Sequence, residues 1–426
     1  MAPVSAVPSV TVPGDKSLSH RALMFAALGT GQSVLRGVLP SADVRNTAGV
    51  LRSLGVELPV VWGLNDTITI RGRGRRGLLA PAADLECGNS GTSTRLLSGI
   101  VAGHAMRATF AGDASLSRRP MRRIARPLTQ MGAVFSFAAD DGLPMTVQGG
   151  DLRDINWVSP TASAQVKSAI LLAALVSGCS ARVQEPTRSR DHTERMLSAL
   201  GAPLIVTDDA VLLDPVAHLG ALDFEVPGDP SSAVFLIASA VLRGQPLEIR
   251  NVGVNATRIG AFAVLQRMGV MLSLANERAS GGEPVADIHV APCAGLRGVS
   301  IGGDEIPALI DEIPVLACLA ARAEGETRIT DAAELRVKES DRIATVVSNL
   351  RAIGADADEL PDGMVIRGGT ATLSGQVITH ADHRIAMSFG VLGAVAGNQI
   401  VIDDPECVDV SFPGFWQTLD ALGAFR

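Results

Sequence analysis

Residues that could bind anions gather in Val12–Leu28, which reads VPGDKSLSHRALMFAAL. Gly14 allows the backbone to turn closely around a ligand. Lys16 and Ser17 follow in the first turn of a predicted helix, where unpaired N–H groups and the helix dipole favour an anion. Arg21 comes four residues after Ser17 and shares its helix face. The stretch therefore predicts an anion site, with an ordinary strand-to-helix turn as the alternative.

Two shorter clusters in the first half have the same character. Asn89, Gly91 and Thr92 open a predicted helix with an amide, bare backbone and a hydroxyl, which again suits an anion. The second cluster is rich in arginine, and Pro120 is expected at the first helical position. Arg119 would then lie beside the positive end of the helix dipole, an unfavourable place for a cation unless an anion is bound there. A solvated basic face is the alternative, and it is our interpretation for Arg122, Arg123 and Arg126.

Two further helix starts combine hydroxyl, amide and charged groups. Ser163 and Gln165 precede the apolar run AILLAALV and suit hydrogen bonds to a hydroxylated ligand, although Ser163 could simply cap the helix. In the next cluster Arg190 is a candidate phosphate ligand and Asp191 a candidate helix cap. His192 is expected to be a structural hydrogen-bonding residue.

The second half supplies candidate acids and bases. Asp311 and Glu312 precede the buried run IPVLACLAA, where two adjacent carboxylates are costly unless something uses or neutralises them. Lys338, Glu339 and Arg342 lie within one helical turn, a pattern that a surface ion-pair face would also explain. Downstream, His383 and Arg384 open an apolar helix.

The cations at loop and helix-start positions in this acidic chain are Lys16, Arg21, Arg119, Arg190, Lys338, Arg342 and Arg384. Such groups bind phosphates and carboxylates. There is no GxxxxGK[ST] motif, no GxGxxG in a suitable context and no metal-ligand spacing. We therefore expect several anionic groups on the ligands, and neither a nucleotide, a metal nor another cofactor.

Two internal repeats predict how these residues are positioned. VPGD recurs at Val226 as VPGDPSSAVFLIASAVL, about half of the 426-residue chain later and without cations. Leu-x-x-apolar-Gly-Val/Ala occurs six times, at Leu51–Val56, Leu128–Ala133, Leu197–Ala202, Leu265–Val270, Leu350–Ala355 and Leu419–Ala424. Each copy is expected to end an amphipathic helix with its glycine at C′. Most are followed by β-rich segments, which indicates subdomains of about 70 residues.

The predicted fold is therefore α/β, with two pseudo-symmetric domains of three such subunits each. The first domain is expected at 14–226, and the second at 1–13 together with 227–426. Runs such as Ala169–Val176 and Ala233–Leu242 are apolar all round, which indicates helices buried inside each domain and sheets outside. Because ligands favour clefts between domains, the active site is expected in the inter-domain cleft.

Composition excludes several classes of protein. A net charge of −7 and the absence of Tyr argue against nucleic-acid binding. Five widely spaced cysteines without a CxxC pair suit reduced thiols rather than disulfides or zinc. No apolar run reaches the ~18 residues of a membrane span, and no targeting segment precedes the first motif. We expect a cytoplasmic protein without a membrane partner, and a monomer.

Eight motifs, in order along the chain, carry a resemblance to a known family. They read PGDKSLSHRALM, GNSGTSTR, SRRPM, SAQVKSAILLA, SRDHTERML, DEIPVLA, LRVKESDRI and DHRIAMSF. The chain resembles the 5-enolpyruvylshikimate-3-phosphate (EPSP) synthases from about Val12 to Pro413. The resemblance implies the enolpyruvyl transferase fold and domain closure on substrate. It implies transfer of the enolpyruvyl group of phosphoenolpyruvate to the 5-hydroxyl of shikimate 3-phosphate, with loss of phosphate, in aromatic amino-acid biosynthesis.

The resemblance also implies residue roles. The residues that it assigns to shikimate 3-phosphate are Lys16, Ser17, Arg21, Ser163, Gln165, Arg190, Asp311 and Lys338. Those that it assigns to phosphoenolpyruvate are Lys16, Asn89, Gly91, Thr92, Arg119, Gln165, Arg342 and Arg384. Asp311 would accept the proton of the attacking hydroxyl. Glu339, with Lys16, would handle the proton at the methylene carbon, and a tetrahedral adduct would then lose phosphate.

Three points bear on this assignment. Many family members have a lysine where this chain has Val410, so one phosphate contact is missing or comes from elsewhere, with Lys338 as the candidate. Gly91 stands where glyphosate-tolerant relatives have alanine, which predicts sensitivity to glyphosate. The alternatives are the sister enzyme that uses UDP-N-acetylglucosamine, whose loop cysteine is absent from Asp113–Arg119, and a non-catalytic phosphate-binding relative, which would be expected to lose Asp311 and Glu339.

Overall fold

The computed structural model describes residues 7–138 and 140–424 and divides into two compact units. The first domain comprises Gly14–Val226 and Ala279–Glu283. The second comprises the described residues before Gly14, together with 227–278 and 284–424. The expected second domain included 279–283, and this is corrected: Ser280 donates a hydrogen bond to the carbonyl of Glu225, and the Glu283 carboxylate pairs with His192. The expected place of residues 1–6 in the second domain lies outside the described residues.

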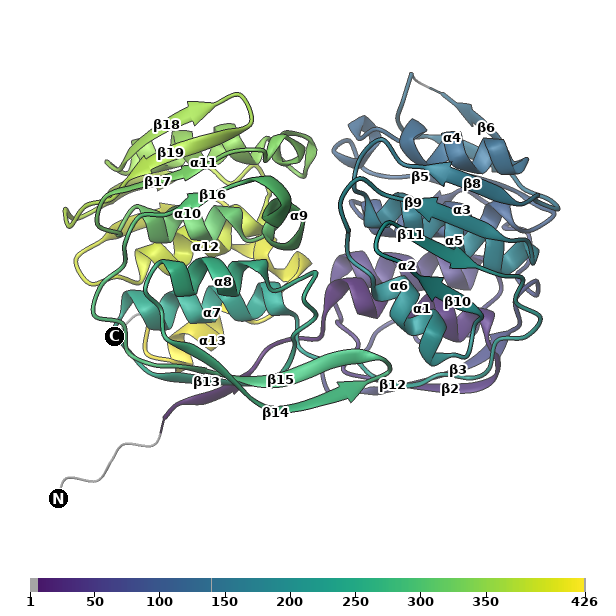
Figure 1. Cartoon of the computed structure of the whole chain (residues 1–426), viewed down its shortest axis with the longest axis horizontal. Helices are drawn as coiled ribbons and strands as arrows, with labels where there is room; N and C mark the ends of the chain where they lie inside the picture. Colours follow the sequence, from purple (N-terminus) through teal and green to yellow (C-terminus); the bar gives the residue numbers. More distant parts are fainter. Residues whose placement is uncertain (1–6, 139, 425–426) are drawn as a thin grey trace. The chain divides into compact units, whose positions relative to one another are not determined.

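The first domain consists of three α/β subunits (Figure 1). Its helices are α1 (Lys16–Leu28), α2 (Ala42–Ser53), α3 (Gly91–Ala102), α4 (Arg122–Met131), α5 (Ala164–Ser177) and α6 (His192–Ala199), with the 3₁₀ turn η1 (Leu116–Arg118). Its strands are β2 (Thr30–Arg36), β3 (Thr67–Arg73), β4 (Leu85–Glu86), β5 (Arg107–Ala111), β6 (Val134–Phe137), β7 (Met145–Gln148), β8 (Ile155–Val158), β9 (Ala181–Gln184), β10 (Leu204–Val206), β11 (Ala210–Leu213) and β12 (Asp223–Glu225). They form sheets in the orders β12-β2-β3, β4-β5-β7-β6 and β10-β11-β9-β8.

The second domain repeats this plan (Figure 1). Its helices are α7 (Pro230–Leu242), α8 (Gly260–Arg267), α9 (Ile306–Leu309), α10 (Ile313–Ala320), α11 (Arg342–Ala352), α12 (His383–Gly393) and α13 (Phe415–Ala421), with the 3₁₀ turns η2 (Gly303–Glu305), η3 (Ala333–Val337) and η4 (Pro405–Val410). Its strands are β1 (Ser9–Thr11), β13 (Leu247–Gly253), β14 (Leu272–Ser280), β15 (Glu283–Val290), β16 (Ser300–Ile301), β17 (Glu326–Ile329), β18 (Asp356–Leu360), β19 (Gly363–Arg367), β20 (Ser374–Val377) and β21 (Gln399–Ile402). The sheets are β1-β13-β15-β14, β16-β17-β19-β18 and the shorter β20-β21.

One parallel strand pair recurs in all six sheets. In each sheet, the strand that follows the first helix of a subunit pairs in parallel with a strand that precedes the first helix of a subunit. Strand β5 pairs in this way with β4, and β21 with β20. For two of the preceding strands, the partner lies in the other half of the chain. Strand β1 precedes α1 but pairs with β13, Val10 lying opposite Ile249, whereas β12 precedes α7 but pairs with β2. The expected return of the N-terminal segment to the second half is therefore observed for Ser9–Thr11.

The expected burial of apolar helices is confirmed. The first helix of each subunit is buried nearly all round; these helices are α1, α3, α5, α7, α10 and α12. In α5 every residue from Val166 to Val176 is buried. The second helix of each subunit buries one face only, as α2 does with Val44, Ala48 and Leu51. Within each domain the helices therefore form the core and the sheets lie outside them (Figure 1).

The six leucine–glycine signatures end helices as predicted. All six glycines have positive φ, from 76° at Gly423 to 120° at Gly132. In every copy the N–H that follows the glycine donates to the carbonyl of the leucine at 2.9–3.0 Å, as Val56 does to Leu51. This is the bond of a Schellman motif, which requires left-handed geometry at the glycine. One detail is corrected: Gly132 is itself the C-cap of α4 and not its C′ residue.

The two VPGD turns also match each other. Asp15 caps α1 by accepting from the N–H of Leu18 at 2.8 Å, and Asp229 caps α7 by accepting from Ser231 at the same distance. A side chain on Gly14 would place its Cβ 1.9 Å from the carbonyl oxygen of Gly37, so only glycine fits there. The turn therefore brings Lys16 directly to the first position of a buried helix.

Candidate active site

The first-domain candidates lie at the N-termini of the three buried helices α1, α3 and α5. Each helix is capped by the residue before it: Asp15, Ser90 and Ser163 accept hydrogen bonds from N–H groups of the first turn. The simple capping role considered for Ser163 is therefore present, since its hydroxyl accepts from Val166 at 3.4 Å. Helices α1 and α3 contact each other, as do α3 and α5, and the Gln165 amide near the start of α5 donates to Thr92 near the start of α3.

The two cations of α1 have different surroundings. Lys16 lies 3.2 Å from a carboxylate oxygen of Asp43, a partner that the sequence did not suggest. Arg21 is 4% exposed and donates to the hydroxyls of Thr193 and Ser168 at 2.8 and 2.9 Å, and to the carbonyl of Ser17 at 3.0 Å. Burial lowers the pKa of Arg21 to about 10 despite nearby carboxylates. A cation held by neutral oxygens in a buried setting favours an incoming anion.

Arg119 is brought to the start of α3 by a polar chain. Its guanidinium donates to the Asn89 side chain at 2.5 Å, and the Asn89 amide donates to Asp113 at 2.7 Å. The predicted helix start at Pro120 is wrong, because α4 begins two residues later at Arg122. The physical reason is distant in sequence: the carboxylate of Asp141 accepts the N–H groups of residues 121 and 122 and so sets the start of α4.

Arg95 is a site residue that the sequence analysis missed. It is 5% exposed and donates to the side-chain oxygen of Gln165 at 2.6 Å, while the Gln165 amide donates to Thr92 at 3.2 Å. These two bonds fix the orientation of the Gln165 amide. They also connect the start of α3 to the start of α5. The signal was available, since Arg95 lies one helical turn after Gly91 on the same face.

The Arg190–His192 segment divides into a candidate ligand and structural residues. Arg190 lies half-buried in the loop before α6 and is close enough to Arg21 for mutual electrostatic repulsion. Asp191 occupies the N-cap position, but the predicted capping role is wrong: no side-chain cap bond forms, and its carboxylate accepts from Arg195 at 2.9 Å. The structural role expected for His192 agrees with its buried 2.9 Å contact to Glu283.

In the second domain, the structure brings the candidate acids and bases together at the starts of α10, α11 and α12. One carboxylate oxygen of Asp311 lies 3.3 Å from Arg342 and 3.7 Å from Lys338, and the other lies 3.8 Å from Arg384. Arg384 also donates to the Asp311 carbonyl at 3.0 Å. The carboxylate of Glu339 accepts from Arg342 at 2.7 Å. The surface ion-pair face considered for this segment is therefore excluded for Arg342, which is 1% exposed.

Asp382, which the sequence analysis also missed, explains how a buried arginine is accommodated. It is fully buried and accepts from two nitrogens of Arg342 at 2.8 and 3.2 Å. Burial alone would lower the pKa of Arg342, but the charges of Asp382, Glu339 and Asp311 outweigh it and raise that pKa. The neighbouring Glu312 is 1% exposed, accepts a hydrogen bond from Ser231 and lies 3.8 Å from Arg384. These partners offset the free-energy cost expected from burying two adjacent carboxylates.

Known proteins resemble this chain over nearly its whole length. The sequence model of EPSP synthase (3-phosphoshikimate 1-carboxyvinyltransferase) matches residues 3–419. A 3-phosphoshikimate 1-carboxyvinyltransferase of Herpetosiphon aurantiacus is 48% identical, over 96% of this chain and 95% of that protein. One of Pelotomaculum thermopropionicum is also 48% identical, over 96% and 94%. The solved EPSP synthase of Acinetobacter baumannii is 42% identical with a TM-score of 0.86, over 97% and 95%.

The chain belongs to the EPSP synthase family. The family, the fold and the 3-phosphoshikimate 1-carboxyvinyltransferase activity expected from the eight motifs are thereby confirmed. The sister enzyme that uses UDP-N-acetylglucosamine is correspondingly disfavoured.

One position departs from many EPSP synthases. Val410 is half-buried at the end of η4, directly before Ser411. The candidate substitute, Lys338, directly follows the 3₁₀ turn η3 as its C-cap and has its ammonium 3.7 Å from Asp311. The ammonium of Lys338 therefore lies beside the candidate base Asp311, whereas many EPSP synthases have a lysine at the position of Val410.

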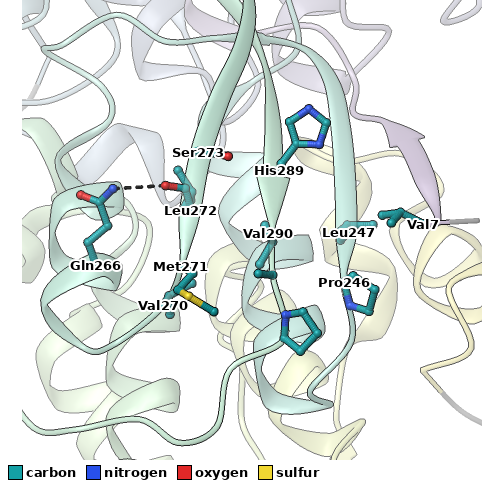
Figure 2. Close-up of a pocket in the computed structure, with 12 residues that line it drawn as sticks. Val7, Pro246, Leu247, Gln266, Val270, Met271, Leu272, Ser273, His289 and Val290 are labelled. Carbon is teal, nitrogen blue, oxygen red and sulfur yellow. Dashed lines mark hydrogen bonds between the residues drawn. The ribbon is translucent and has the colours of Figure 1, made fainter.

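A pocket of about 530 Å³ elsewhere in the second domain does not fit the substrates of EPSP synthases. Figure 2 shows apolar side chains on three neighbouring strands, with Gln266 donating to the carbonyl of Leu272. None of the predicted site residues lines this pocket, and its twelve lining residues include no lysine or arginine to bind a phosphate. Over residues 7–138 and 140–424 there is no group of three or more metal-ligating side chains, and no helix long and apolar enough to cross a membrane.

Proposed function

We propose that this chain transfers the enolpyruvyl group of phosphoenolpyruvate to the 5-hydroxyl of shikimate 3-phosphate with the residues that the motifs identify. The single observation that carries the residue assignment is the cluster at Asp311. Three cations and a second carboxylate, Glu339, are gathered at three helix starts of one domain. Acid–base chemistry beside anion-binding groups requires such an arrangement.

Shikimate 3-phosphate would be held largely by the first domain. In this proposal Lys16, Ser17, Arg21 and Arg190 bind its charged groups, and Ser163 and Gln165 bind its hydroxyls. Two features support this assignment: the buried Arg21 donates to the neutral oxygens of Thr193, Ser17 and Ser168, and the Gln165 amide is fixed by Arg95. Asp311 and Lys338 of the second domain would complete the set.

Phosphoenolpyruvate would be bound by two groups of residues. The first domain would offer Lys16, Gln165 and the start of α3, which comprises Asn89, Gly91, Thr92 and Arg119. The second domain would offer Arg342 and Arg384. Because these residues belong to different domains, the proposed reaction requires the first-domain residues and the second-domain residues to bind the same pair of substrates. Positioning two bound reactants can contribute about 7–11 kcal/mol to lowering the barrier.

The proposed chemistry proceeds in two stages. Asp311 accepts the proton of the 5-hydroxyl as that oxygen attacks the substituted carbon of the enol, and a proton from Glu339 or Lys16 is delivered to the methylene carbon. The resulting tetrahedral adduct loses a methyl proton and its phosphate, which restores the double bond. Cations around both phosphates and carboxylates stabilise the charge that moves during these steps.

The proposal also covers the oligomeric state and the cellular compartment of the protein. We propose a monomer, because every assigned residue comes from one chain. We propose that it acts in the cytoplasm, because all five cysteines are free thiols, as a reducing compartment requires.

Phosphate release from phosphoenolpyruvate tests the proposal, with shikimate 3-phosphate or UDP-N-acetylglucosamine as acceptor. We expect release with the shikimate ester alone. Release with the nucleotide sugar alone would show that the acceptor is wrong. No release with either, despite binding of shikimate 3-phosphate, would support a non-catalytic relative.

A further inference from the structure

One buried carboxylate contacts both arginines that the proposed function assigns to phosphoenolpyruvate. Asp382 precedes α12, and one of its oxygens accepts the N–H of Arg384 at 3.0 Å, which caps this helix. The same oxygen accepts from Arg342 at 3.2 Å, and the other accepts from Arg342 at 2.8 Å and from the hydroxyl of Ser340 at 3.0 Å. All of these partners lie in the second domain.

We propose that Asp382 is a positioning residue that sets the orientation of Arg342 and Arg384 for phosphoenolpyruvate. This inference rests on the proposed function. A two-point contact fixes the plane of a guanidinium as well as its location. Nε and Nη2 of Arg342 donate to Asp382, and in this orientation Nη1 also donates to Asp311 and Nη2 to Glu339.

The second arginine is oriented through the backbone. By capping α12 at its first turn, Asp382 sets where the helix starts, and therefore where the Arg384 side chain leaves it. That side chain reaches the carbonyl of Asp311 at 3.0 Å. A single carboxylate thus fixes both arginines relative to the candidate base.

Burial argues that this contact is specific. Asp382 is 0% exposed and Arg342 is 1% exposed, so neither charge has water as a substitute partner. Removing one member of such a pair leaves the other charge buried and short of partners. In Asp382→Asn, Arg342 would therefore be expected to shift toward its remaining carboxylates, Asp311 and Glu339, and away from its present orientation.

The test is steady-state kinetics of Asp382→Asn in the full-length chain, together with calorimetric binding of shikimate 3-phosphate alone. We expect KM for phosphoenolpyruvate to rise at least ten-fold, kcat to fall by less than KM rises, and Kd for shikimate 3-phosphate to stay within two-fold. Asp287→Asn is the matched control. Asp287 is also a buried carboxylate of this domain, bound to a backbone N–H and an asparagine amide and 3.8 Å from an arginine, but it lies on β15, an inner strand of the sheet β1-β13-β15-β14.

Two results would overturn the inference. One is a KM for phosphoenolpyruvate within two-fold of wild type in Asp382→Asn. The other is an equal rise in Asp287→Asn, which would mark a general loss of stability. Failure of the proposed function is distinguishable, because the wild-type chain would then release no phosphate with shikimate 3-phosphate.

A double-mutant cycle isolates the route through Arg342. We expect Arg342→Lys to lower kcat/KM for phosphoenolpyruvate by about 100-fold in the wild-type background, and by less than three-fold in the Asp382→Asn background. Equal losses in the two backgrounds would overturn the inference. If Asp382→Asn does not fold, Ser340→Ala removes one of its contacts while keeping the charge; KM for phosphoenolpyruvate should then rise two- to five-fold, and no rise would contradict the inference.

Discussion

Arg342 donates a 3.3 Å hydrogen bond to Asp311 from a guanidinium that is almost completely buried. The candidate base is therefore held by a side chain that is itself fixed, with Lys338 and Arg384 at 3.7 and 3.8 Å. A proton acceptor must be within reach of the proton in a defined orientation, and this arrangement restricts how the Asp311 carboxylate can turn.

Replacing Asp311 with asparagine tests its role as the base. The amide keeps the size of the side chain but cannot accept the hydroxyl proton, so we expect kcat to fall by about 10²–10⁴-fold. Binding of shikimate 3-phosphate, measured by calorimetry, should survive. Glu339→Gln is the comparison variant, because it removes the other candidate carboxylate from the same arginine. Unchanged turnover in Asp311→Asn would remove Asp311 as the base.

The repeating architecture was predictable from the sequence because its determinants are local. The six Leu-x-x-apolar-Gly signatures close Schellman bonds within six residues, and both VPGD turns are capped by their own aspartates. Helices such as Ala169–Val176 were recognisable as buried because they have no polar face. Such features can be predicted from the sequence because the residues that form them are close together in the chain.

The residues that hold the site together were not predictable in the same way. Asp43, Arg95 and Asp382 act on partners 27, 70 and 40 positions away, and no local pattern names such a partner. The start of α4 was placed wrongly for the same reason, because Asp141 caps it from 20 residues downstream. Long-range pairs become visible only when the topology is known.

Gly91→Ala is expected to weaken glyphosate inhibition of an enzyme that is otherwise sensitive. An added Cβ would lie 3.3 Å from Arg95 and 3.4 Å from Arg119, in both cases at the guanidinium end of a long side chain. These ends can yield by a few tenths of an ångström, so folding should be retained while the space beside two cations narrows. We expect a rise of at least ten-fold in the glyphosate inhibition constant and a smaller rise in KM for phosphoenolpyruvate.

Inhibition assays against varied phosphoenolpyruvate check this prediction. The wild-type chain should be inhibited at glyphosate concentrations comparable to its KM for phosphoenolpyruvate. Inhibition only far above that concentration would show that Gly91 does not confer sensitivity here. Melting temperatures of both proteins serve as the control for folding.

Val410 and Lys338 together predict how this chain compensates for the missing family lysine. If Lys338 replaces that phosphate contact, Lys338→Met should raise KM for shikimate 3-phosphate, the substrate to which Lys338 is assigned, about ten-fold, the equivalent of one charged contact. Val410→Lys should restore part of the loss when added to Lys338→Met. Steady-state kinetics of both single variants and the double variant check this, and equal KM values in Lys338→Met with and without Val410→Lys would show that the two positions do not substitute for each other.

His20 predicts how stability depends on pH. Its ring is buried in α1 and contacts the Thr47 hydroxyl at 2.7 Å, and burial, with the charges of Lys16 and Arg21, lowers the pKa of His20 well below 6.5. Above about pH 6.5 the ring is neutral in both the folded and unfolded states. As pH falls below 6.5 only the unfolded chain takes up this proton, so His20 should lower the free energy of unfolding by up to about 1.4 kcal/mol per pH unit until the folded pKa is reached.

His20→Gln should therefore flatten the loss of stability between pH 6.5 and 5. Denaturant unfolding from pH 7.5 to 5 measures this slope, and the comparison of slopes is independent of any constant loss caused by the substitution itself. His218→Gln is the control, because His218 lies exposed at the surface and outside α1. Equal slopes for wild type and His20→Gln would mean that the ring is not held neutral in the folded chain.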